Sequence, residues 1–418
     1  ELNEQMQIRR DKLAEYEADG IYPFGQRFIV KDNAKEIKDD FFLKYDGQPV
    51  VIAGRLMTIR SHGKTAFANV RDKSGDIQVY FRKDVLGEEA YKYVKMLDIG
   101  DIIGVEGHVF KTHTGEVTIK VNKLTLLSKS LRPLPEKWHG LKDTELRYRQ
   151  RYVDLIVNPE VRDTFVKRSQ IVAKIREYMM RDGFMEVETP MMHAIPGGAA
   201  ARPFITHHNA LDIDIYMRIA PELYLKRLIV GGMDRVFEMN RCFRNEGIDN
   251  RHNPEFTTIE SYQAYGDVED AIRLTENLVS YCAQEVLGTQ EITYQGTEIN
   301  LTPPWNRITM AEGVKKYTGE DFDAVTTVEE ARAIADRLNV EYTDNDGIGK
   351  ILNACFEDYV EENLIQPTIV YGHPKEISPL AKASRENPLA TERFEAFIYG
   401  RELANGFSEL NDPIDQKQ

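Results

Sequence analysis

Residues 241–256 read "RCFRNEGIDNRHNPEF", and this stretch places three arginines, one histidine and two glutamates between two apolar runs. The flanking residues, 235–244 and 255–265, are rich in the aromatic and branched side chains that are typical of β strands. Two such runs joined by a polar segment predict a long antiparallel hairpin with the charge at its tip. A loop needs polar residues but not three guanidinium groups, so the tip is a candidate binding site.

One face of the second predicted strand carries residues suited to a ligand. Phe256, Glu260 and Tyr262 are an even number of residues apart and therefore project from the same face. Phe256 and Glu260 are expected roughly 13 Å apart, which places an aromatic ring at one end of a bound molecule and a carboxylate at the other. Arginine suits phosphate because its planar fork donates two parallel hydrogen bonds. A surface hairpin with mutually neutralising charges explains the same composition, and the residues alone leave both interpretations open.

Length and composition limit the class of protein. The chain has 418 residues, 42% of them hydrophobic, which is enough for two or three domains with cores of their own. No run approaches the 18 or so apolar residues of a membrane helix, and the charged first residues do not resemble a signal or transit peptide. The net charge of -14 confines any nucleic-acid binding to local basic patches.

The cysteines indicate the compartment. Cys242, Cys282 and Cys355 lie far apart without a CxxC pair, which argues against a disulfide framework or a zinc site. We therefore expect a cytoplasmic protein with no membrane segment.

Four regions follow one another along the chain. Residues 1–45 form a predicted helical extension, and residues 46–128 contain five short β runs separated by glycine turns, which predict a closed barrel of the OB type. Residues 129–150 have prolines and a basic excess, as in a linker. Residues 151–418 alternate strand and helix patterns, so the whole is an α+β protein.

The last region contains three predicted helices. One carries an apolar face over residues 171–179 and is followed by a strand at 183–190. A second helix spans about 267–287 and ends at Gly288, and a capping box opens a third near 328–338.

The predicted barrel has an aromatic residue on its polar face. In two neighbouring strands, small and branched residues alternate with a second set that shares the opposite face, namely Phe67, Arg71, Gln78, Tyr80 and Arg82. Single-stranded bases require an aromatic plane, a hydrogen-bonding amide and cations for the phosphates. Phe67 could equally fill the barrel while the arginines are merely solvated.

Six segments together resemble a known family. "FRNEG" and "RHNPEF" in the hairpin are similar to motif 2 of class II aminoacyl-tRNA synthetases, and "GFMEVETPMM" resembles motif 1, the dimer-forming helix and strand. More narrowly, "PGGAAARPF", "HHNALD", "APELYLKRL" and "GRELANGFSELNDP" resemble the lysyl-tRNA synthetases. The resemblance covers essentially the whole chain, and six motifs in the right order are very unlikely by chance.

The resemblance implies a lysine–tRNA ligase. Such an enzyme joins L-lysine to ATP, releases pyrophosphate, and transfers lysine from the adenylate to the 3'-terminal ribose of tRNA-Lys. It also implies a catalytic domain built on an antiparallel sheet with flanking helices, an OB-fold that binds the anticodon, a homodimer formed through motif 1, and Mg²⁺ with the ATP.

The resemblance also implies the site residues. The ATP-binding residues would be Arg244, Glu246, Arg251, His252, Asn253 and Phe256, of which Arg244, Glu246 and Arg251 are the expected catalytic residues. The lysine-binding residues would be Gly198, Glu222, Arg244, Glu260, Tyr262, Asn405, Phe407 and Glu409. Glu395 and Glu402 would be the magnesium ligands, and Phe67 and Gln78 would contact the anticodon. An acidic pocket suits lysine because its ammonium regains opposite charge when it loses water.

Several of these residues also have ordinary explanations. Glu395 would fit a helix surface, Glu409 a solvated turn, and Tyr262 a hydrophobic core. Asn405, Phe407 and Glu409 are expected on one strand face by their spacing of two.

The resemblance is incomplete at one point. Motif 3 of the family, a glycine-rich strand and helix with a further arginine, is not found before the last residues "NDPIDQKQ". We expect truncation of the chain rather than loss of adenylation, because the other active-site positions are in place. The alternatives are a protein that holds tRNA or lysine without catalysis, and a paralogue that attaches lysine to a protein, against which the anticodon-like barrel argues.

Overall fold

The computed structural model describes residues 3–135, 141–249 and 252–417. Contacts divide the chain into two compact units, Glu1–Asp163 and Thr164–Gln418, and each is described by itself. Within the described residues, no helix is both long and apolar enough to cross a membrane.

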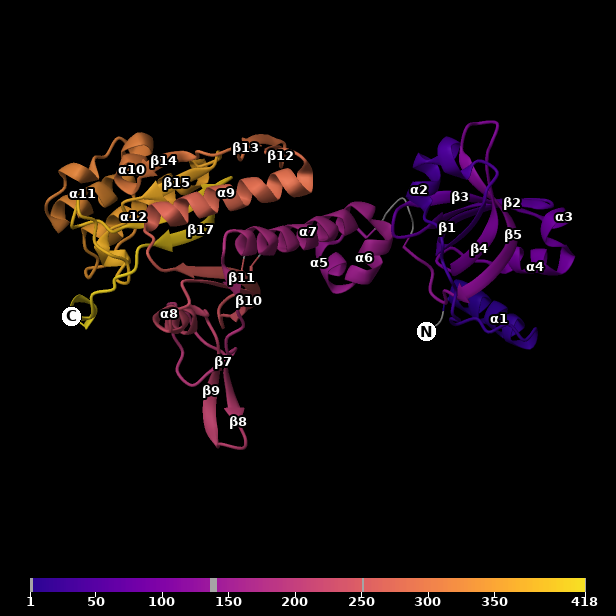
Figure 1. Ribbon diagram of the computed structural model, residues 1–418, viewed down its shortest axis with the longest axis horizontal. Helices are drawn as coiled ribbons and strands as arrows, with labels where there is room; N and C mark the ends of the chain where they lie inside the picture. The colour runs from indigo at the N-terminus through magenta and orange to yellow at the C-terminus, as the bar shows by residue number, and fades with distance from the viewer. Residues whose placement is uncertain (1–2, 136–140, 250–251, 418) are drawn as a thin grey trace. The chain divides into compact units, whose positions relative to one another are not determined.

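The first unit contains a closed five-stranded barrel (Figure 1). Its strands are β1 (Pro49–His62), β2 (Thr65–Arg71), β3 (Asp76–Arg82), β4 (Ile102–Lys111) and β5 (Val117–Ser128), in the order β1-β2-β3-β5-β4. Every second residue of β2 and β3 is buried, as the alternation predicts, because the small and branched side chains fill the barrel. The predicted OB-type barrel is confirmed.

Helical segments precede the barrel strands and lie between the third and fourth. They are α1 (Glu4–Ala18), α2 (Ala34–Asp39), the π-helical turn η1 (Phe41–Tyr45), α3 (Lys83–Leu86) and α4 (Glu88–Met96). The sequence pattern does not predict α3 and α4, which lie between the third and fourth strands. Tyr91 and Val94 of α4 are buried in the barrel core, so tertiary packing stabilises this short helix.

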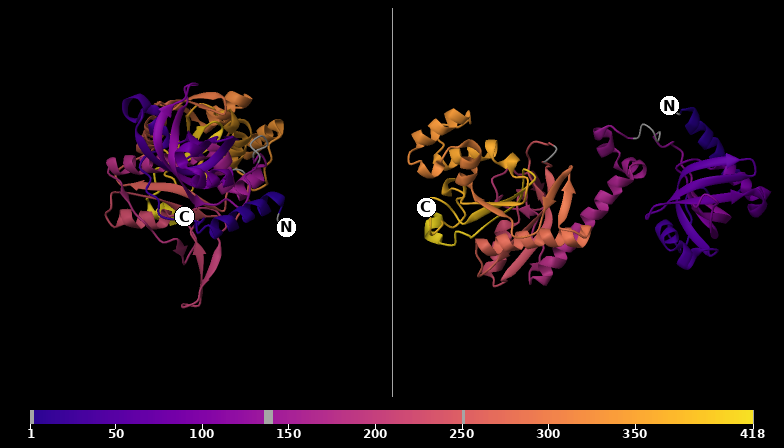
Figure 2. Two further views of the ribbon diagram at one scale, coloured as in Figure 1. Left: turned by 90° about the vertical axis from the view of Figure 1, so that its right-hand side faces the viewer. Right: turned by 90° about the horizontal axis from the view of Figure 1, so that it is seen from above.

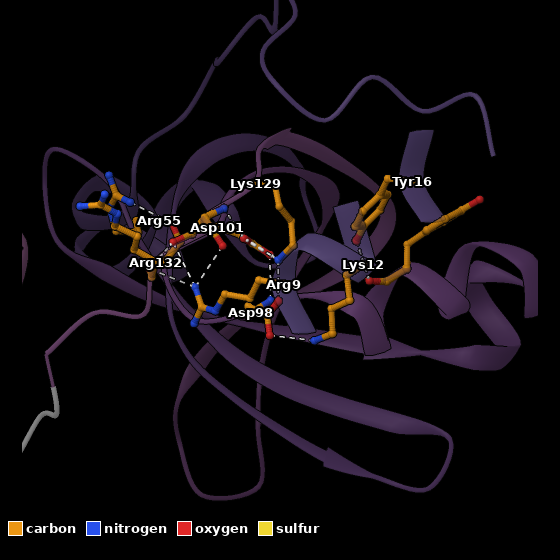
Figure 3. Close-up of polar contacts among 11 residues, drawn as sticks. Arg9, Lys12, Tyr16, Arg55, Asp98, Asp101, Lys129 and Arg132 are labelled. Atoms are coloured by element: carbon orange, nitrogen blue, oxygen red, sulfur yellow. Dashed lines mark hydrogen bonds and ion pairs between the residues drawn. The ribbon is translucent and has the colours of Figure 1, made fainter. Parts of the chain in front are cut away.

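A buried ion-pair network joins α1 to the barrel (Figure 3). Lys129 Nζ lies 2.6 Å from Asp98 Oδ2 and 2.9 Å from Asp101 Oδ2, and the side chains of Lys129 and Asp101 are both fully buried. Lys12 of α1 pairs with the other oxygen of Asp98 at 2.8 Å. Arg9 of α1 donates to the carbonyl oxygen of Ser130 at 3.1 Å. The segment predicted as a linker therefore begins inside the packed core of the first unit.

Two further helices belong to the first unit by contact, α5 (Thr144–Arg149) and α6 (Arg151–Val157). Arg71 Nη1 donates to the carbonyl oxygen of Ile156 at 3.0 Å and so joins α6 to the barrel. The domain boundaries given above, with a linker at 129–150, stay a prediction.

The second unit contains a three-stranded sheet in the order β11-β10-β6. Its strands are β6 (Met185–Glu186), β10 (Arg235–Phe243) and β11 (Glu255–Gln263), and α7 (Pro159–Arg181) leads into β6. The strand predicted at 183–190 is shorter than expected: β6 covers only Met185–Glu186, and beyond it the backbone N–H and hydroxyl of Thr189 donate to the side chain of Glu238.

A second sheet of four strands lies against a long helix (Figure 1). Its strands are β14 (Asn306–Thr309), β15 (Thr368–Tyr371), β16 (Arg393–Ile398) and β17 (Arg401–Phe407). The helix is α9 (Val268–Leu287), which ends at Gly288 with φ 75°, as predicted. Ile272 of α9 packs with Phe394 and Trp305 in the core between helix and sheet.

The remaining elements complete the second unit. The hairpin of β8 (Ile205–His208) and β9 (Ile213–Met217), with β7 (Met192–His193) beside it, projects from the unit in both Figure 1 and Figure 2. The others are α8 (Glu222–Val230), β12 (Glu291–Tyr294), β13 (Thr297–Asn300), α10 (Met310–Thr318), η2 (Phe322–Ala324), α11 (Val328–Leu338), α12 (Ile348–Tyr359), η3 (Glu361–Asn363), η4 (Lys375–Ile377) and α13 (Pro413–Lys417). The capping box of Thr327 and Glu330 opens α11, as predicted.

Candidate active site

The charged hairpin has the predicted form. Strands β10 and β11 pair antiparallel from Arg235–Gln263 at one end to Phe243–Glu255 at the other. Beyond the last pair, the N–H of Arg244 donates to the carbonyl oxygen of Pro254 at 2.8 Å. The N–H of Asn245 donates to the carbonyl oxygen of Arg202 at 2.7 Å, which fixes the hairpin tip against the preceding loop.

Arg244 is positioned for an anionic ligand. Its guanidinium carbon lies 5.2 Å from the ring centre of Phe256, so the aromatic ring and the cation face each other across the hairpin. The Nε atom is buried, and no hydrogen-bond partner reaches it within the described part of the chain. A buried donor without a partner costs free energy, and a bound phosphate or carboxylate would supply the acceptor.

The other residues expected around ATP are exposed at the tip. Glu246 Oε1 accepts from the N–H of Arg202 at 3.4 Å, and His252 Nδ1 lies 2.8 Å from Asp249 Oδ2. Asn253 is exposed. Arg251 lies outside the described residues, so its predicted role stays a prediction.

The acidic residues that are expected to form the lysine pocket begin at Glu260 on β11. The hydroxyl of Tyr262 donates to Glu260 Oε2 at 3.2 Å, which confirms that these two side chains share a face. Burial, followed by the nearby charge of Glu222, raises the pKa of Glu260 to about 7. Tyr262 therefore has a polar partner in the pocket and is not simply a core residue.

Two further carboxylates, those of Glu222 and Glu409, form ion pairs with the same lysine. Lys226 Nζ lies 2.6 Å from Glu222 Oε1 and 2.9 Å from Glu409 Oε2. Gly198 has φ 92°, and a Cβ there would lie 3.2 Å from Cβ of Glu222, so glycine lets this loop approach α8. Glu409 follows the end of β17 in an isolated bridge with Ala381, so it is paired rather than in a free turn.

A buried ion pair lies at the strand next to Glu260. Arg218 Nη1 lies 2.8 Å from Glu238 Oε1, and both side chains are almost completely buried. Arg218 also donates to the carbonyl oxygen of Arg241 at 2.8 Å and to the hydroxyl of Thr189 at 3.2 Å. These bonds tie the strand before α8 to the hairpin, and hence Glu222 to Glu260.

Strands β16 and β17 bring the remaining predicted residues together. Arg393 Nε donates to Asn405 Oδ1 at 2.9 Å, and Arg393 Nη2 donates to Glu395 Oε1 at 2.5 Å. Phe407 lies opposite Arg393 in the sheet. Glu395 is on a strand and mostly buried, so the helix-surface interpretation is wrong.

The two carboxylates expected to bind magnesium are close enough to interact. Burial opposes ionisation of Glu395, but His373 and Arg393 hold its pKa below the usual value. Glu402 is exposed as a residue on β17, but partial removal of its carboxylate from water, followed by the charge of Glu395, raises its pKa. Within the described ranges, no group of three or more His, Cys, Asp or Glu forms a metal site. Two carboxylate donors fit Mg²⁺ when phosphate oxygens and water complete the shell.

The barrel presents its predicted aromatic face. The rings of Phe67 and Tyr80 are stacked with centroids 4.3 Å apart, and Gln78 lies opposite Asn69 on the same pair of strands. Both rings are half-buried and belong to the outward-facing set, so Phe67 does not fill the barrel.

The two arginines on that face are already paired. Arg71 forms an ion pair with Asp76, and Arg82 with Asp84. They are not free cations for phosphate in this structure.

Three residues that the sequence does not single out organise the site. Lys226 follows Glu222 by one helical turn, a spacing that signals an ion pair on one helix face. Arg393 precedes Glu395 by two residues on one strand, which places both on the same face. No local pattern points to Arg218, because its partners lie 20 or more residues away in the chain.

Comparisons with known proteins identify the family of this chain. Residues 143–418 match the family described as tRNA synthetases class II (D, K and N), and residues 50–127 match the OB-fold nucleic acid binding domain. The chain is 58% identical to the lysine–tRNA ligase of Thermoanaerobacter pseudethanolicus and 59% identical to that of Carboxydothermus hydrogenoformans. All of this chain is aligned in both cases, with 84% and 86% of the relatives. The chain therefore belongs to the class II tRNA synthetases, as a member of the lysine–tRNA ligases.

Proposed function

We propose that this chain activates L-lysine with ATP and transfers it to the 3'-terminal ribose of tRNA-Lys. The observation that carries the proposal is the position of Arg244. It faces the ring of Phe256 on one side, and its charge acts on both Glu260 and Glu402. One cation is therefore close to the groups expected for adenine, lysine and magnesium.

The acidic pocket would select lysine among amino acids. Glu222, whose side chain is only 10% exposed, would bind the α-ammonium group, with Gly198 beside it. Glu260, Tyr262 and Glu409 would surround the ε-ammonium group. The carboxylates offset the cost of removing the lysine ammonium from water. A competing amino acid with a neutral side chain would not pair with them and would leave them buried without a counter-ion. Asn405 and Phe407 would complete the pocket wall.

ATP would bind along the hairpin. The adenine ring would stack on Phe256, and Arg244 would hold both the lysine carboxylate and the α-phosphate. Glu246, His252 and Asn253 at the tip would contact the base and phosphates, and Arg251 would reach the γ-phosphate.

Magnesium would enter with the nucleotide. Glu395 and Glu402 would hold it, because carboxylates and phosphate oxygens together form the oxygen shell that this ion prefers. When bound, the ion neutralises phosphate charge. Arg393 keeps Glu395 in place by a direct hydrogen bond.

The chemistry needs positioning more than a general base. A lysine carboxylate oxygen attacks the α-phosphorus in line, a new P–O bond forms, and the bond to pyrophosphate breaks. Arg244 neutralises the charge that develops on the α-phosphate. In the second step the ribose hydroxyl attacks the acyl carbon, a new ester bond forms, the bond between the acyl carbon and the phosphate oxygen breaks, and AMP leaves while the hydroxyl proton passes to its phosphate or to water.

The barrel, the partner subunit and the compartment complete the proposal. Phe67 would stack on an anticodon base and Gln78 would hydrogen-bond to one, because these side chains lie on the outward face of neighbouring strands.

The motif 1 segment at 183–192 would form a homodimer, as the family resemblance implies, and the protein would act in the cytoplasm.

Amino-acid-dependent exchange of pyrophosphate into ATP, measured with each of the twenty amino acids, tests the proposal. We expect exchange with lysine alone. Exchange with a different amino acid would contradict the pocket assignment but keep the adenylation chemistry. Retained tRNA binding without any exchange would favour a protein that holds tRNA without catalysis.

A further inference from the structure

Lys226 joins three elements of the pocket. Its ammonium pairs with Glu222 one turn earlier on α8 and with Glu409 after β17, at 2.6 and 2.9 Å. It also lies 5.9 Å from the ring centre of Tyr262 on β11. The side chain is only 28% exposed, and its two ion pairs hold the ammonium among the acidic residues of the proposed site.

Each carboxylate keeps one oxygen for a ligand. Lys226 contacts Oε1 of Glu222 and Oε2 of Glu409, and among residues 3–135, 141–249 and 252–417 no hydrogen bond reaches the second oxygen of either group. An ionised carboxylate accepts at both oxygens. The ion pairs therefore orient the two carboxylates and leave one oxygen of each to accept hydrogen bonds from a ligand.

Lys226 also sets the charge of the pocket. Glu222, Glu260 and Glu409 contribute three negative charges when ionised, and Lys226 and Arg244 contribute two positive charges. Glu238 is neutralised separately by Arg218. Once a bound cation keeps Glu260 ionised, these five groups have an excess of one negative charge, and free lysine, with two ammonium groups and one carboxylate, has a net charge of plus one.

We propose that Lys226 is a positioning residue that sets the specificity of the lysine pocket, an inference that rests on the function proposed above. Its ammonium holds Glu222 and Glu409 with one oxygen each directed to the substrate. It also matches the pocket to a ligand with a single net positive charge. The side chain stays in place when lysine binds, and it discriminates against diamines without a carboxylate.

Calorimetric titration with lysine and with cadaverine tests this inference. Cadaverine has the ammonium groups of lysine without the carboxylate, so it has two positive charges. In Lys226→Met, lysine binding is expected to weaken about tenfold or more, because two charged hydrogen-bonding groups lose their orientation. The preference for lysine over cadaverine is expected to narrow by roughly tenfold, because the pocket then favours the more highly charged ligand.

Two further variants separate this role from a structural one. Lys226→Arg keeps the charge and is expected to restore the preference for lysine. Lys174→Met is a matched control, because Lys174 bridges Glu177 and Glu285 at 2.7 and 3.1 Å and is 29% exposed, outside the pocket. It is expected to bind both ligands like the unaltered chain.

The outcomes distinguish the inference from the proposed function. If the unaltered chain does not bind lysine, the proposed function fails. If it binds lysine but Lys226→Met binds both ligands unchanged, or loses both by the same factor, the inference is overturned.

Discussion

Glu260 lies directly opposite Glu238 across the β10–β11 hairpin, and the two carboxylates are in different electrostatic environments. Glu238 is paired with the buried guanidinium of Arg218 at 2.8 Å. Glu260 receives only the hydroxyl of Tyr262 at 3.2 Å as a hydrogen bond among the described residues, and burial raises its pKa to about 7. The pocket therefore contains a carboxylate that is costly to ionise until a cation binds.

Replacing Glu260 by Gln is expected to stabilise the empty protein. The folded-state pKa lies above the ordinary value of 4.5, so Glu260 costs stability as the pH rises from about 4.5 to 7, and the full cost remains above pH 7. The variant should gain about 1 to 3 kcal/mol at pH 8 and nothing at pH 4. Unfolding by urea at both pH values measures this difference.

A neighbouring glutamate provides the control. Glu255→Gln alters an exposed residue of the same strand and is expected to change stability by no more than about 0.5 kcal/mol. Glu260→Gln should also lose lysine binding. Equal stabilisation at pH 4 and pH 8 would contradict the prediction, since the gain would then not come from ionisation.

Replacing Glu402 by Gln is expected to reduce the magnesium dependence of ATP binding. The preference of the unaltered chain for ATP in the presence of Mg²⁺ over ATP with a chelator should fall about tenfold or more, because one of the two proposed protein ligands is lost. Titration with ATP under both conditions measures this ratio. Glu298→Gln, at an exposed position on β13, should keep it, and the magnesium assignment is wrong if Glu402→Gln keeps it too.

The sequence predicts elements whose signal is local. The alternation of β2 and β3, the hairpin of β10 and β11, and the terminal Gly288 of α9 are each determined by neighbouring residues, and the structure confirms them. The strand before Pro190 is shorter than predicted, and beyond its end Thr189 donates to the side chain of Glu238, 49 residues along the chain, which no local pattern encodes.

The site is less predictable than the fold. Glu260 and Tyr262 follow from a spacing of two along one strand. The bridge between Glu222 and Glu409 depends on the packing of α8 against the chain after β17, which no sequence spacing encodes. The alternation of β2 places Arg71 on the outward face but does not show that Asp76 neutralises its charge there.

Replacing Phe67 by Ala is expected to weaken tRNA binding about tenfold or more, because the stacking of a base on an aromatic ring contributes roughly 1 to 3 kcal/mol. The ring stacks on Tyr80 on one side, and we expect a base to stack on its other face. Filter binding at one fixed salt concentration measures the effect. Phe42→Ala removes an aromatic ring that is 77% exposed outside these strands and should have no effect. An equal loss in both variants would contradict the assignment.

Replacing Lys129 by Met is expected to destabilise the first unit by about 3 to 5 kcal/mol, because Asp98 and Asp101 then lose their buried counter-ion. Asp101 is most affected: it is fully buried, and burial already raises its pKa although Lys129 opposes this. Hydrogen exchange of peptides from β1 to β5 at increasing urea concentration locates the loss in the barrel. Lys123→Met, which removes an exposed ion pair with Glu106, should cost less than about 1 kcal/mol. If both variants lose the same amount, the buried ion pairs of Lys129 contribute no more than an exposed pair, and the prediction is wrong.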